Sequence, residues 1–437
     1  MLKSSMNRRN FILSSLASAG FFGSISGGLY PAPVKADTAG VRNPFVPVKQ
    51  ITKGSGFHWF GYYDKLQFDP SSRFAAGMKT VFDKRTPAAD DVLEIGIIDL
   101  EDKNYTWNKI GESKAWSWQQ GCMLQWIPGS ATDVIWNDRE DGHYVSRIYN
   151  TKTGETKTLP KAIYALSPCG KWAVGTEFSR INDLRPGYGY TGLKDPYFDV
   201  KAPDEIGIYR LNLETGEHTL VAPLGQFAKI PHNGQDVSDN FHWFNHLLVN
   251  TDGTRLTFLN RWRKERMDRQ KMAATGWTTR MFTLGLDGSE PYIINSSGYI
   301  SHFVWADAKH IAAFVKADGK DWRLWLLEDK TGKLTPVGQE KITADGHNTF
   351  IPGTDNRWIL NDTYPDKERY QTLYVYDRKT DRRQNLAGFF EPKEFTGEWR
   401  VDLHARTSPD GKKIIVDSSH TGERQMHLLD MSGFDYR

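Results

Sequence analysis

Four histidines occupy the same position in four successive sequence repeats, and imidazoles that converge in this way can bind a metal ion or move protons. They are His246, His302, His347 and His404, and each lies three residues before the residue that opens a turn. The chain has 12 histidines in 437 residues, so four consecutive equivalent positions are not expected by chance. Neutral imidazole is a common metal ligand and a proton carrier near neutral pH. The alternative is four structural histidines held by hydrogen bonds.

Two further residues could join this group. Asp402 precedes His404 by two positions and His242 precedes His246 by four, so on a strand each pair would face the same side. Asp402 could be a carboxylate ligand or a partner that orients an imidazole. Three other histidines are expected to be surface or packing residues, namely His310, His420 and His427.

The elements that must position these side chains are repeated pairs of strands joined by turns rich in Pro, Asp or Gly. Seven such stretches recur at a mean spacing of roughly 56 residues, with further alternating strands between them. They are residues 65–77, 123–138, 163–175, 246–259, 302–314, 347–360 and 404–416. Repeats of this length with about four strands each predict an all-β, seven-bladed β-propeller, with six or eight blades as alternatives. The wide gap before the fourth stretch contains residues 180–200, which we interpret as a long loop.

In such a ring the strand before each turn is the innermost one, and equivalent positions form a circle around the axis. The other three blades carry Lys65, Met123 and Ile163 at this position. We therefore expect the four imidazoles along an arc at one mouth of the central channel.

The N-terminal segment has the pattern of an export signal. Arg8 and Arg9 are followed by Phe11, a weakly apolar stretch and the small-residue sequence Val34-Lys35-Ala36. This pattern predicts a twin-arginine signal peptide at residues 1–36, a single propeller domain at 37–437, and a periplasmic or secreted protein. The alternative is an ordinary buried N-terminal helix. No later segment is long and apolar enough to predict a membrane span.

The net charge, the cysteine count and the motifs that are missing argue against several classes of function. The formal net charge is +3, and residues 1–36 carry four basic residues and no acidic one, so the remainder is near −1. This balance gives no reason to expect nucleic-acid binding. Cys122 and Cys169 permit one disulfide after export but exclude a four-cysteine zinc site. A phosphate-binding loop, a nucleophile elbow and an HExxH motif are all missing from the sequence.

Basic and aromatic residues lie beside the histidine repeats. Residues 260–271 carry six basic and two acidic residues, which would form either a solvated helical loop or a cationic wall for an anionic substrate. In the second case Arg261 would be nearest the channel, with Arg280 close by on the next strand. Tyr188 and Tyr190 are candidates for a phenolic acid. The candidate substrate-binding residues are Tyr62, Tyr63, His58, Arg185 and Gln120.

The stretches SHFVW (301–305), HARTSPDG (404–411) and FHWFNHLLVNTDGTRLTFL (241–259) resemble the β-propeller polysaccharide lyases, and among them the oligogalacturonate lyases. The resemblance is good in the second half of the chain and poor in the first. It implies a seven-bladed propeller with a divalent metal, usually manganese, that cleaves uronate-containing oligosaccharides by β-elimination. The ulvan lyases, which share the propeller and use His, Tyr and Arg, are the second resemblance.

The resemblance also implies roles for single residues. His302 matches a metal ligand in a Ser/Thr-His-x-x-Trp stretch. His404 matches the last ligand of a Gln-x-x-His-x-His cluster, in which this chain has Trp399 and Asp402 at the other two positions. His246 matches a channel histidine near the substrate, and His347 would replace the lost ligand.

Together these residues support a hypothesis with named roles. His302, His347 and His404, assisted by Asp402, would bind a divalent ion, with Mn²⁺ expected and Ca²⁺ or Zn²⁺ as alternatives. The base that removes the C5 proton would be His246 or His242, and the carboxylate of an anionic uronate substrate would be bound by Arg261 or Arg280. The acid would be a tyrosine of residues 188–190 or 62–63. The competing hypothesis is a non-catalytic periplasmic propeller that binds a protein or glycan partner.

Overall fold

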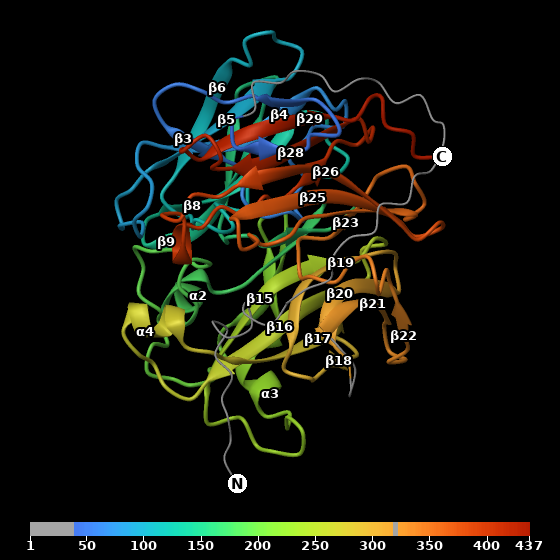
Figure 1. Cartoon of the computed structure of the whole chain (residues 1–437). Coiled ribbons are helices and arrows are strands. Elements are labelled where there is room, and N and C mark those ends of the chain that lie inside the picture. Colours follow the sequence, from blue (N-terminus) through green and yellow to red (C-terminus); the bar gives the residue numbers. More distant parts are fainter. Residues whose placement is uncertain (1–38, 318–321) are drawn as a thin grey trace.

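The computed structural model describes residues 39–317 and 322–437, whose strands form seven antiparallel sheets arranged as the blades of a ring (Figure 1). One sheet has five strands and the other six have four. The predicted fold, an all-β seven-bladed propeller, is confirmed. The predicted signal peptide lies outside the described residues. Within the described residues, no helix combines the length and apolar character needed to cross a membrane.

Each blade is a meander of consecutive strands, innermost strand first. The strands of the first four blades are β3 (Phe57–Trp59), β4 (Phe74–Thr80), β5 (Leu93–Asp99) and β6 (Trp107–Ser113); β7 (Gln125–Trp126), β8 (Asp133–Glu140), β9 (His143–Asn150) and β10 (Thr156–Leu159); β11 (Ala165–Leu166), β12 (Trp172–Gly175), β13 (Gly207–Asn212) and β14 (His218–Pro223); and β15 (Phe241–Val249), β16 (Arg255–Arg263), β17 (Thr278–Gly285) and β18 (Tyr292–Asn295).

The last three blades include two strands from the start of the described chain. Their strands are β19 (Ile300–Trp305), β20 (His310–Lys316), β21 (Trp322–Glu328) and β22 (Leu334–Pro336); β23 (Thr349–Phe350), β24 (Trp358–Asn361), β25 (Tyr370–Asp377), β26 (Arg382–Phe390) and β1 (Val41–Arg42); and β27 (Arg406–Thr407), β28 (Lys413–Ser418), β29 (Gln425–Asp430) and β2 (Val48–Gln50). Because β2 pairs with β29, a strand from the beginning of the described chain completes the last blade and closes the ring.

The strands are buried on both faces because each blade lies between two others. Along β20, Ile311 and Ala313 pack into one apolar cluster while Ala312 and Phe314 pack into the next. This explains why residues 311–315 of this strand, IAAFV, are continuously apolar instead of alternating.

The predicted strand-turn-strand register is found in the structure, with one difference in the first blade. In the last blade the Gly411 N–H donates to the Ser408 carbonyl at 2.9 Å, and Gly411 has the left-handed φ of 71° that favours glycine. In the first blade the inner strand β3 ends at Trp59, and the predicted stretch at 65–77 contributes only the bridge Phe68–Ala75 before β4. The segment between them leaves the sheet and enters the channel.

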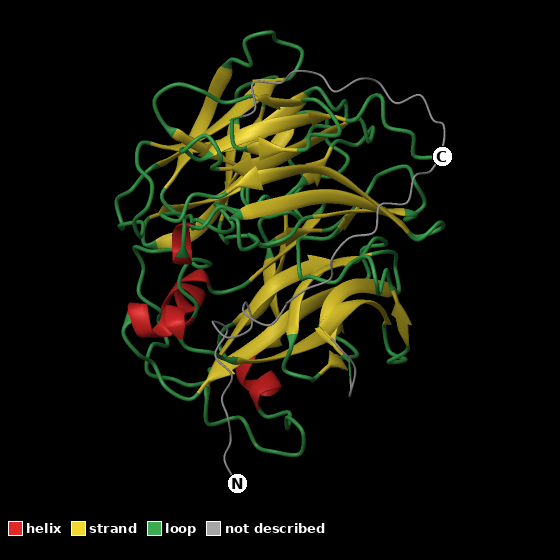
Figure 2. Cartoon of the chain, viewed as in Figure 1, coloured by secondary structure: helices red, strands yellow, loops and turns green. Residues whose placement is uncertain are grey.

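The predicted long loop at 180–200 is only partly a loop, because it begins in a helix. The helix α2 (Phe178–Leu184) starts where the Glu177 carboxylate accepts a hydrogen bond from the Ser179 N–H. The other helices are α3 (Leu224–Ala228), α4 (Arg269–Ala274) and the 3₁₀ helix η1 (Gly397–Trp399). Figure 2 shows α2, α4 and η1 gathered on one side of the molecule. Arg269 of α4 joins them, since its guanidinium contacts Glu398 at 2.8 and 2.9 Å and Asn182 at 3.0 Å.

Candidate metal and active site

Three of the four histidines of the repeat lie at points where the backbone of the inner strand, or of the segment leading into it, is irregular. The pairing register of β15 shifts between Asn245 and Leu248, and that of β19 shifts between Ile300 and Phe303, so His246 and His302 lie in bulges. His246 and His404 have φ values of 53° and 42°, in the left-handed region that non-glycine residues rarely adopt. A bulge re-aims a side chain out of the regular pleat. Local irregularities therefore turn His246, His302 and His404 out of the regular pleat, whereas His347 shows neither a register shift nor a left-handed φ.

The four imidazoles surround the ring of Tyr62. The centroid of this ring lies 5.2 Å from that of His246, 6.4 Å from His302, 6.3 Å from His347 and 5.0 Å from His404. Histidines from four blades, up to 158 positions apart, thus share one neighbour. The structure brings together the arc that the repeat register predicts.

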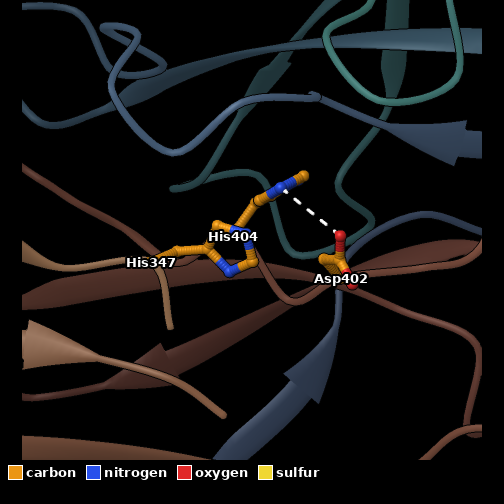
Figure 3. Close-up of side chains that lie close together, drawn as sticks. All are labelled: His347, Asp402 and His404. Atoms are coloured by element: carbon orange, nitrogen blue, oxygen red, sulfur yellow. Dashed lines mark ion pairs between the residues drawn. The ribbon is translucent and has the colours of Figure 1, made fainter. Parts of the chain in front are cut away.

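Three residues of this group are arranged as metal ligands. His347, Asp402 and His404 each offer one ligand atom, all within 4.8 Å of one another (Figure 3). His347 Nε2 and His404 Nε2 are buried without a hydrogen-bond partner, while Asp402 Oδ2 lies 3.9 Å from His404 Nε2 and forms an ion pair with Arg400 Nε at 2.8 Å. Buried polar atoms are normally paired, so two unpaired imidazole nitrogens next to a carboxylate oxygen fit a bound cation.

His302 lies beside this group but outside it. Its ring centroid is 4.1 Å from that of His347, whereas the set of mutually close ligand atoms comprises only the other three residues. The predicted four-residue set is therefore divided into three converging ligands and one adjacent imidazole.

Two carboxylates hold the imidazoles from behind. His347 Nδ1 donates to Asp362 at 2.8 Å, which leaves Nε2 as the nitrogen that faces the group. His302 Nδ1 lies 3.0 Å from Asp345. A carboxylate behind a ligating histidine fixes its tautomer and makes it a better ligand.

The charges around the imidazoles separate their pKa values. Burial disfavours the charged form of His347, but the carboxylates of Asp362, Asp402 and Asp345 outweigh it and raise its pKa above the ordinary value. Burial lowers the pKa of His404 well below the ordinary value, and His347 and two arginines lower it further. The pKa of His302 is also lowered, by burial and then by His347.

Arg400 connects the candidate ligands to a second part of the site. Its Nε lies 2.8 Å from Asp402 Oδ2, and its Nη2 donates to the Tyr188 hydroxyl at 3.0 Å. Burial acts to raise the pKa of Tyr188, but Arg400 and Arg185 prevail and lower it to about 8. The Tyr188 ring lies 5.7 Å from the ring of His246.

Several cations surround His246 and keep it neutral. Burial lowers its pKa well below the ordinary value, and Arg261, His302, Arg185 and Lys65 add to this effect. Arg185 lies over the rings of Tyr188 and Trp277, at 4.3 Å from each centroid. Here a neutral imidazole, a phenol of lowered pKa and several positive charges lie together, which suits proton transfer on an anionic substrate.

No known family profile and no curated protein sequence matches the chain. Solved structures do match. An oligogalacturonate lyase in complex with manganese superposes with a TM-score of 0.62 at 14% identity, over 91% of this chain and 96% of that one. An oligogalacturonate lyase from Vibrio parahaemolyticus superposes with a TM-score of 0.59 at 15% identity, over 89% and 95%. The chain has the fold of the oligogalacturonate lyases. The predicted resemblance is therefore confirmed for the fold.

Within this fold, two predicted residues are held away from the site. His242 Nε2 donates to the Val237 carbonyl at 2.7 Å, and its Nδ1 accepts from the Asn260 amide at 3.3 Å, so both nitrogens are occupied. Arg280 donates to Asn260 and to the carbonyls of Ile230, Pro231 and Phe227. The prediction that His242 and Arg280 serve as alternative base and carboxylate ligand is wrong, because the strand geometry turns both into the fourth blade.

Two further candidates are structural. The Tyr190 hydroxyl accepts from Asn137 at 2.9 Å while its ring stacks on Phe178 at 4.1 Å, and burial raises its pKa well above the ordinary value. His58 Nδ1 contacts Gln425 at 3.0 Å between the first and last blades. Neither residue contacts the histidine group among the described residues, which corrects their predicted roles.

Tyr62 and Tyr63 are buried and pack against the histidine rings. Tyr63 reaches from the first blade to the fifth, where its hydroxyl donates to the Phe303 carbonyl at 3.0 Å and accepts from the Phe303 N–H at 2.9 Å. Gly61 precedes them with a φ of 100°, and its Cβ position would lie 3.1 Å from Gln120 backbone. The pair forms a floor beneath the histidines, with Tyr62 against the site and Tyr63 fixed by the backbone of Phe303.

The floor is anchored by a buried ion pair in the last blade. The Asp417 carboxylate accepts from the N–H groups of Phe60 and Gly61, both at 3.1 Å. Arg406 contacts the same carboxylate at 2.8 and 3.1 Å and the Gly61 carbonyl at 3.2 Å. The first and last blades thus jointly fix the segment that leads into Tyr62 and Tyr63.

The remaining predicted residues lie near the site. The Tyr164 hydroxyl donates to Gln120 at 2.8 Å and accepts from the His246 N–H at 2.8 Å, so Gln120 supports the bulge that holds His246. Arg261 is buried, with Nε at 3.4 Å from Thr279 and its guanidinium near Trp277. The basic stretch therefore begins as a strand end with two buried arginines, Arg261 and Arg263, and continues into α4, so it is not a solvated helical loop throughout.

Four residues of the site were not predicted from the sequence. Arg400 shares the alternation of Asp402 and His404, and Asp345 precedes His347 by two, so a spacing signal existed for both. Asp362 and Tyr364 follow the second strand of their blade and carry no such signal. The ring of Tyr364 lies 6.1 Å from His302 and 5.8 Å from His347, and 38% of this residue is exposed.

The two cysteines are not paired. Cys122 is buried with its sulfur 3.6 Å from the sulfur of Met78, and Cys169 is exposed. Both are free thiols in the structure.

Proposed function

We propose that this protein is a polysaccharide lyase that cleaves uronate-containing glycans by metal-assisted β-elimination. The observation that carries the proposal is the convergence of two buried, unpaired imidazole nitrogens, from His347 and His404, with the Asp402 carboxylate. This group lies beside His246, Tyr188 and a set of arginines. The likeness in fold to oligogalacturonate lyases adds support at the level of architecture.

A divalent cation would be held by His347, His404 and Asp402, with His302 next to them. Two imidazoles disfavour Ca²⁺, which takes oxygen ligands. We propose Mn²⁺ ahead of Zn²⁺ because the structurally similar oligogalacturonate lyase is in complex with manganese. When bound, the cation neutralises the substrate carboxylate and so makes the neighbouring C5 proton more acidic. Asp362 keeps the proton of His347 on Nδ1, away from the cation.

His246 would be the base. It is partly exposed, is kept neutral by burial and by the positive charges around it, and can accept a proton. A substrate carboxylate bound by Arg261 or Arg185 would offset those charges. The pKa of His246 would then rise when substrate binds, so His246 would be a stronger base in the enzyme–substrate complex than in the free protein.

Tyr188 would be the acid that protonates the leaving oxygen. The Arg400 guanidinium and the Arg185 cation lower its pKa to about 8, so the phenol remains protonated at neutral pH but releases its proton more readily than a free tyrosine. Arg400 fixes the hydroxyl at 3.0 Å, which orients it in the site. The resulting reaction breaks the C4–O bond, forms the C4–C5 double bond, and moves one proton to His246 and one from Tyr188.

The N-terminal sequence supports a proposed twin-arginine export to the periplasm or medium, where such glycans would be met. Ulvan-like glycans are a second candidate substrate for the same chemistry.

The deciding experiment incubates the purified protein with oligogalacturonate, ulvan and glucuronan while ultraviolet absorbance records the unsaturated uronate product. We expect product with Mn²⁺, none after chelation, and recovery when Mn²⁺ is restored. If protein shown to bind the metal forms no product from any of the three substrates, the proposed lyase activity is refuted.

A further inference from the structure

One member of the candidate metal centre already has a positively charged partner. Asp402 offers one of the three mutually close ligand atoms, and its Oδ2 lies 3.9 Å from His404 Nε2. The same oxygen lies 2.8 Å from Arg400 Nε. The ligand nitrogens of His347 and His404, in contrast, have no hydrogen-bond partner. A metal ion bound at Oδ2 would therefore have to share this oxygen with a guanidinium or displace it.

The charge of Arg400 opposes metal binding. A divalent ion and a guanidinium at one carboxylate oxygen would both be attracted to a single negative charge while repelling each other. Asp402 is only 4% exposed, so water and salt screen this repulsion weakly. An arginine in a protein does not lose its proton, so the repulsion cannot be relieved by deprotonation.

Arg400 does not depend on Asp402 alone for its position. Its Nη2 donates to the Tyr188 hydroxyl at 3.0 Å, and its Nη1 donates to the carbonyl of Gly397, an exposed residue, at 3.2 Å. The Arg400 side chain is 24% exposed, whereas that of Asp402 is 2% exposed. The guanidinium thus contacts a buried carboxylate on one side and an exposed backbone carbonyl on another. Its planar set of N–H donors is suited to a second carboxylate that arrives from solvent.

We propose that Arg400 competes with the metal ion for Asp402, and that the carboxylate of an anionic sugar relieves this competition. In the proposed reaction the metal ion attracts the substrate carboxylate, which would then also lie beside the guanidinium. This second anion would release Asp402 Oδ2 to the metal ion. Metal ion and uronate would each bind more tightly in the presence of the other, because linkage between two ligands is reciprocal.

This inference rests on the proposed function and deepens it, since the substrate itself would promote metal binding. The opposite role for Arg400 is to hold Asp402 in place as a ligand. Removing a competitor raises the affinity for the metal ion, whereas removing a positioning residue lowers it. The sign of the change therefore distinguishes the two roles.

The test measures Mn²⁺ binding to the metal-free protein, with free Mn²⁺ followed by electron paramagnetic resonance. Arg400→Met removes the charge, and we expect its affinity for Mn²⁺ to exceed that of the wild type on the order of 10-fold or more. Arg400→Lys keeps the charge and should stay near the wild type. The matched control is Arg357→Met, because the Arg357 side chain is also 24% exposed and pairs with a buried carboxylate, Asp377, at 2.6 Å. It should leave the affinity unchanged.

The same assay with D-galacturonate tests the coupling. A saturating concentration should raise the Mn²⁺ affinity of the wild type on the order of 10-fold, and in Arg400→Met the rise should shrink to about 2-fold or less. D-Galactose, which lacks the carboxylate, should have no effect on either protein. His404→Ala, measured in parallel, corrects for Mn²⁺ that D-galacturonate binds in solution.

Failure of this inference and failure of the proposed function give different results. The inference is overturned, and the metal centre stands, if Arg400→Met binds Mn²⁺ as the wild type does or more weakly, or if D-galacturonate raises both affinities equally. If neither protein binds Mn²⁺ with or without D-galacturonate, the metal centre is refuted together with the competition. If the coupling is found but no uronate glycan yields unsaturated product, the inference stands and the lyase does not. Should Arg400→Met fail to fold, Arg400→Gln carries the same expectation, because its amide can still donate to Tyr188.

Discussion

Replacing Asp362 by Asn should weaken metal binding at the channel centre without removing a ligand. The Asp362 carboxylate accepts one hydrogen bond from the backbone N–H of His347 and one from the ring Nδ1 of His347, both at 2.8 Å, and Asp362 is 1% exposed. Both contacts are to Oδ1, and Nδ1 also lies 3.0 Å from Oδ2, the oxygen that an amide would replace with an NH₂ group. If its NH₂ turns toward Nδ1, the imidazole must carry its proton on Nε2, the atom that faces Asp402 and His404.

The expected loss follows from the role of such partners. Removing a carboxylate behind a ligating histidine costs about 10- to 100-fold in metal affinity, or about 1.4 to 2.7 kcal/mol. Isothermal titration of the metal-free protein with Mn²⁺ measures this directly, and it requires no substrate. Because a neutral amide accepts these buried hydrogen bonds more weakly than a carboxylate, the free energy of unfolding should also fall, by about 1 kcal/mol.

The matched control is Asp377→Asn, a buried carboxylate on β25 of the same blade that pairs with Arg357 at 2.6 Å. It should lose stability but keep the affinity for Mn²⁺. Unchanged Mn²⁺ affinity in a folded Asp362→Asn variant would show that the tautomer of His347 is not set by Asp362. Equal losses in both variants would instead attribute the effect to general destabilisation.

Three further predictions concern Tyr188, Arg406, and the two buried histidines His58 and His242. Tyr188→Phe should lower turnover on a uronate oligosaccharide by about 10²- to 10⁴-fold with little change in KM, and an unaltered rate would exclude Tyr188 as the acid. Arg406→Met strands the Asp417 carboxylate in the core and should cost about 3 to 5 kcal/mol in urea unfolding, whereas a loss within measurement error would mean that the pair does not anchor the channel floor. His58 and His242 have pKa values lowered by burial from 6.5 to about 4, so the unfolded chain binds protons first as pH falls. The free energy of unfolding should therefore decline between about pH 6.5 and pH 4, by up to about 3 kcal/mol for each residue, and a flat profile in denaturant titrations would contradict this.

The spacing of the repeats is sufficient to predict the fold and the place of the histidines. Blades are related by rotation about one axis, so residues at the same register position must lie on a circle. Register alone therefore groups His246, His302, His347 and His404, although they are far apart in the chain. The alternation of Asp402 with His404 likewise places a carboxylate next to an imidazole.

Side-chain direction, in contrast, does not follow from the register. His242 and His246 would lie on the same face of a regular strand, so their spacing predicted the same role for both. The bulge after Asn245 turns only His246 to the axis. Asp345 and Asp402 both precede a histidine by two positions, yet Asp345 contacts His302 of the preceding blade while Asp402 faces His404. Spacing along a strand does not specify where a bulge occurs or which blade supplies the partner.

The sequence by itself determined the ring, its seven-fold register and the residue types that meet at its mouth, because these follow from local periodicity repeated along the chain. Only the tertiary structure decided which of these side chains face one another. The Tyr62–Tyr63 floor depends on Asp417 and Phe303, which lie hundreds of positions away, and Arg400 reaches Tyr188 across blades. Such contacts are selected by packing and hydrogen bonding between blades, and no local pattern records them.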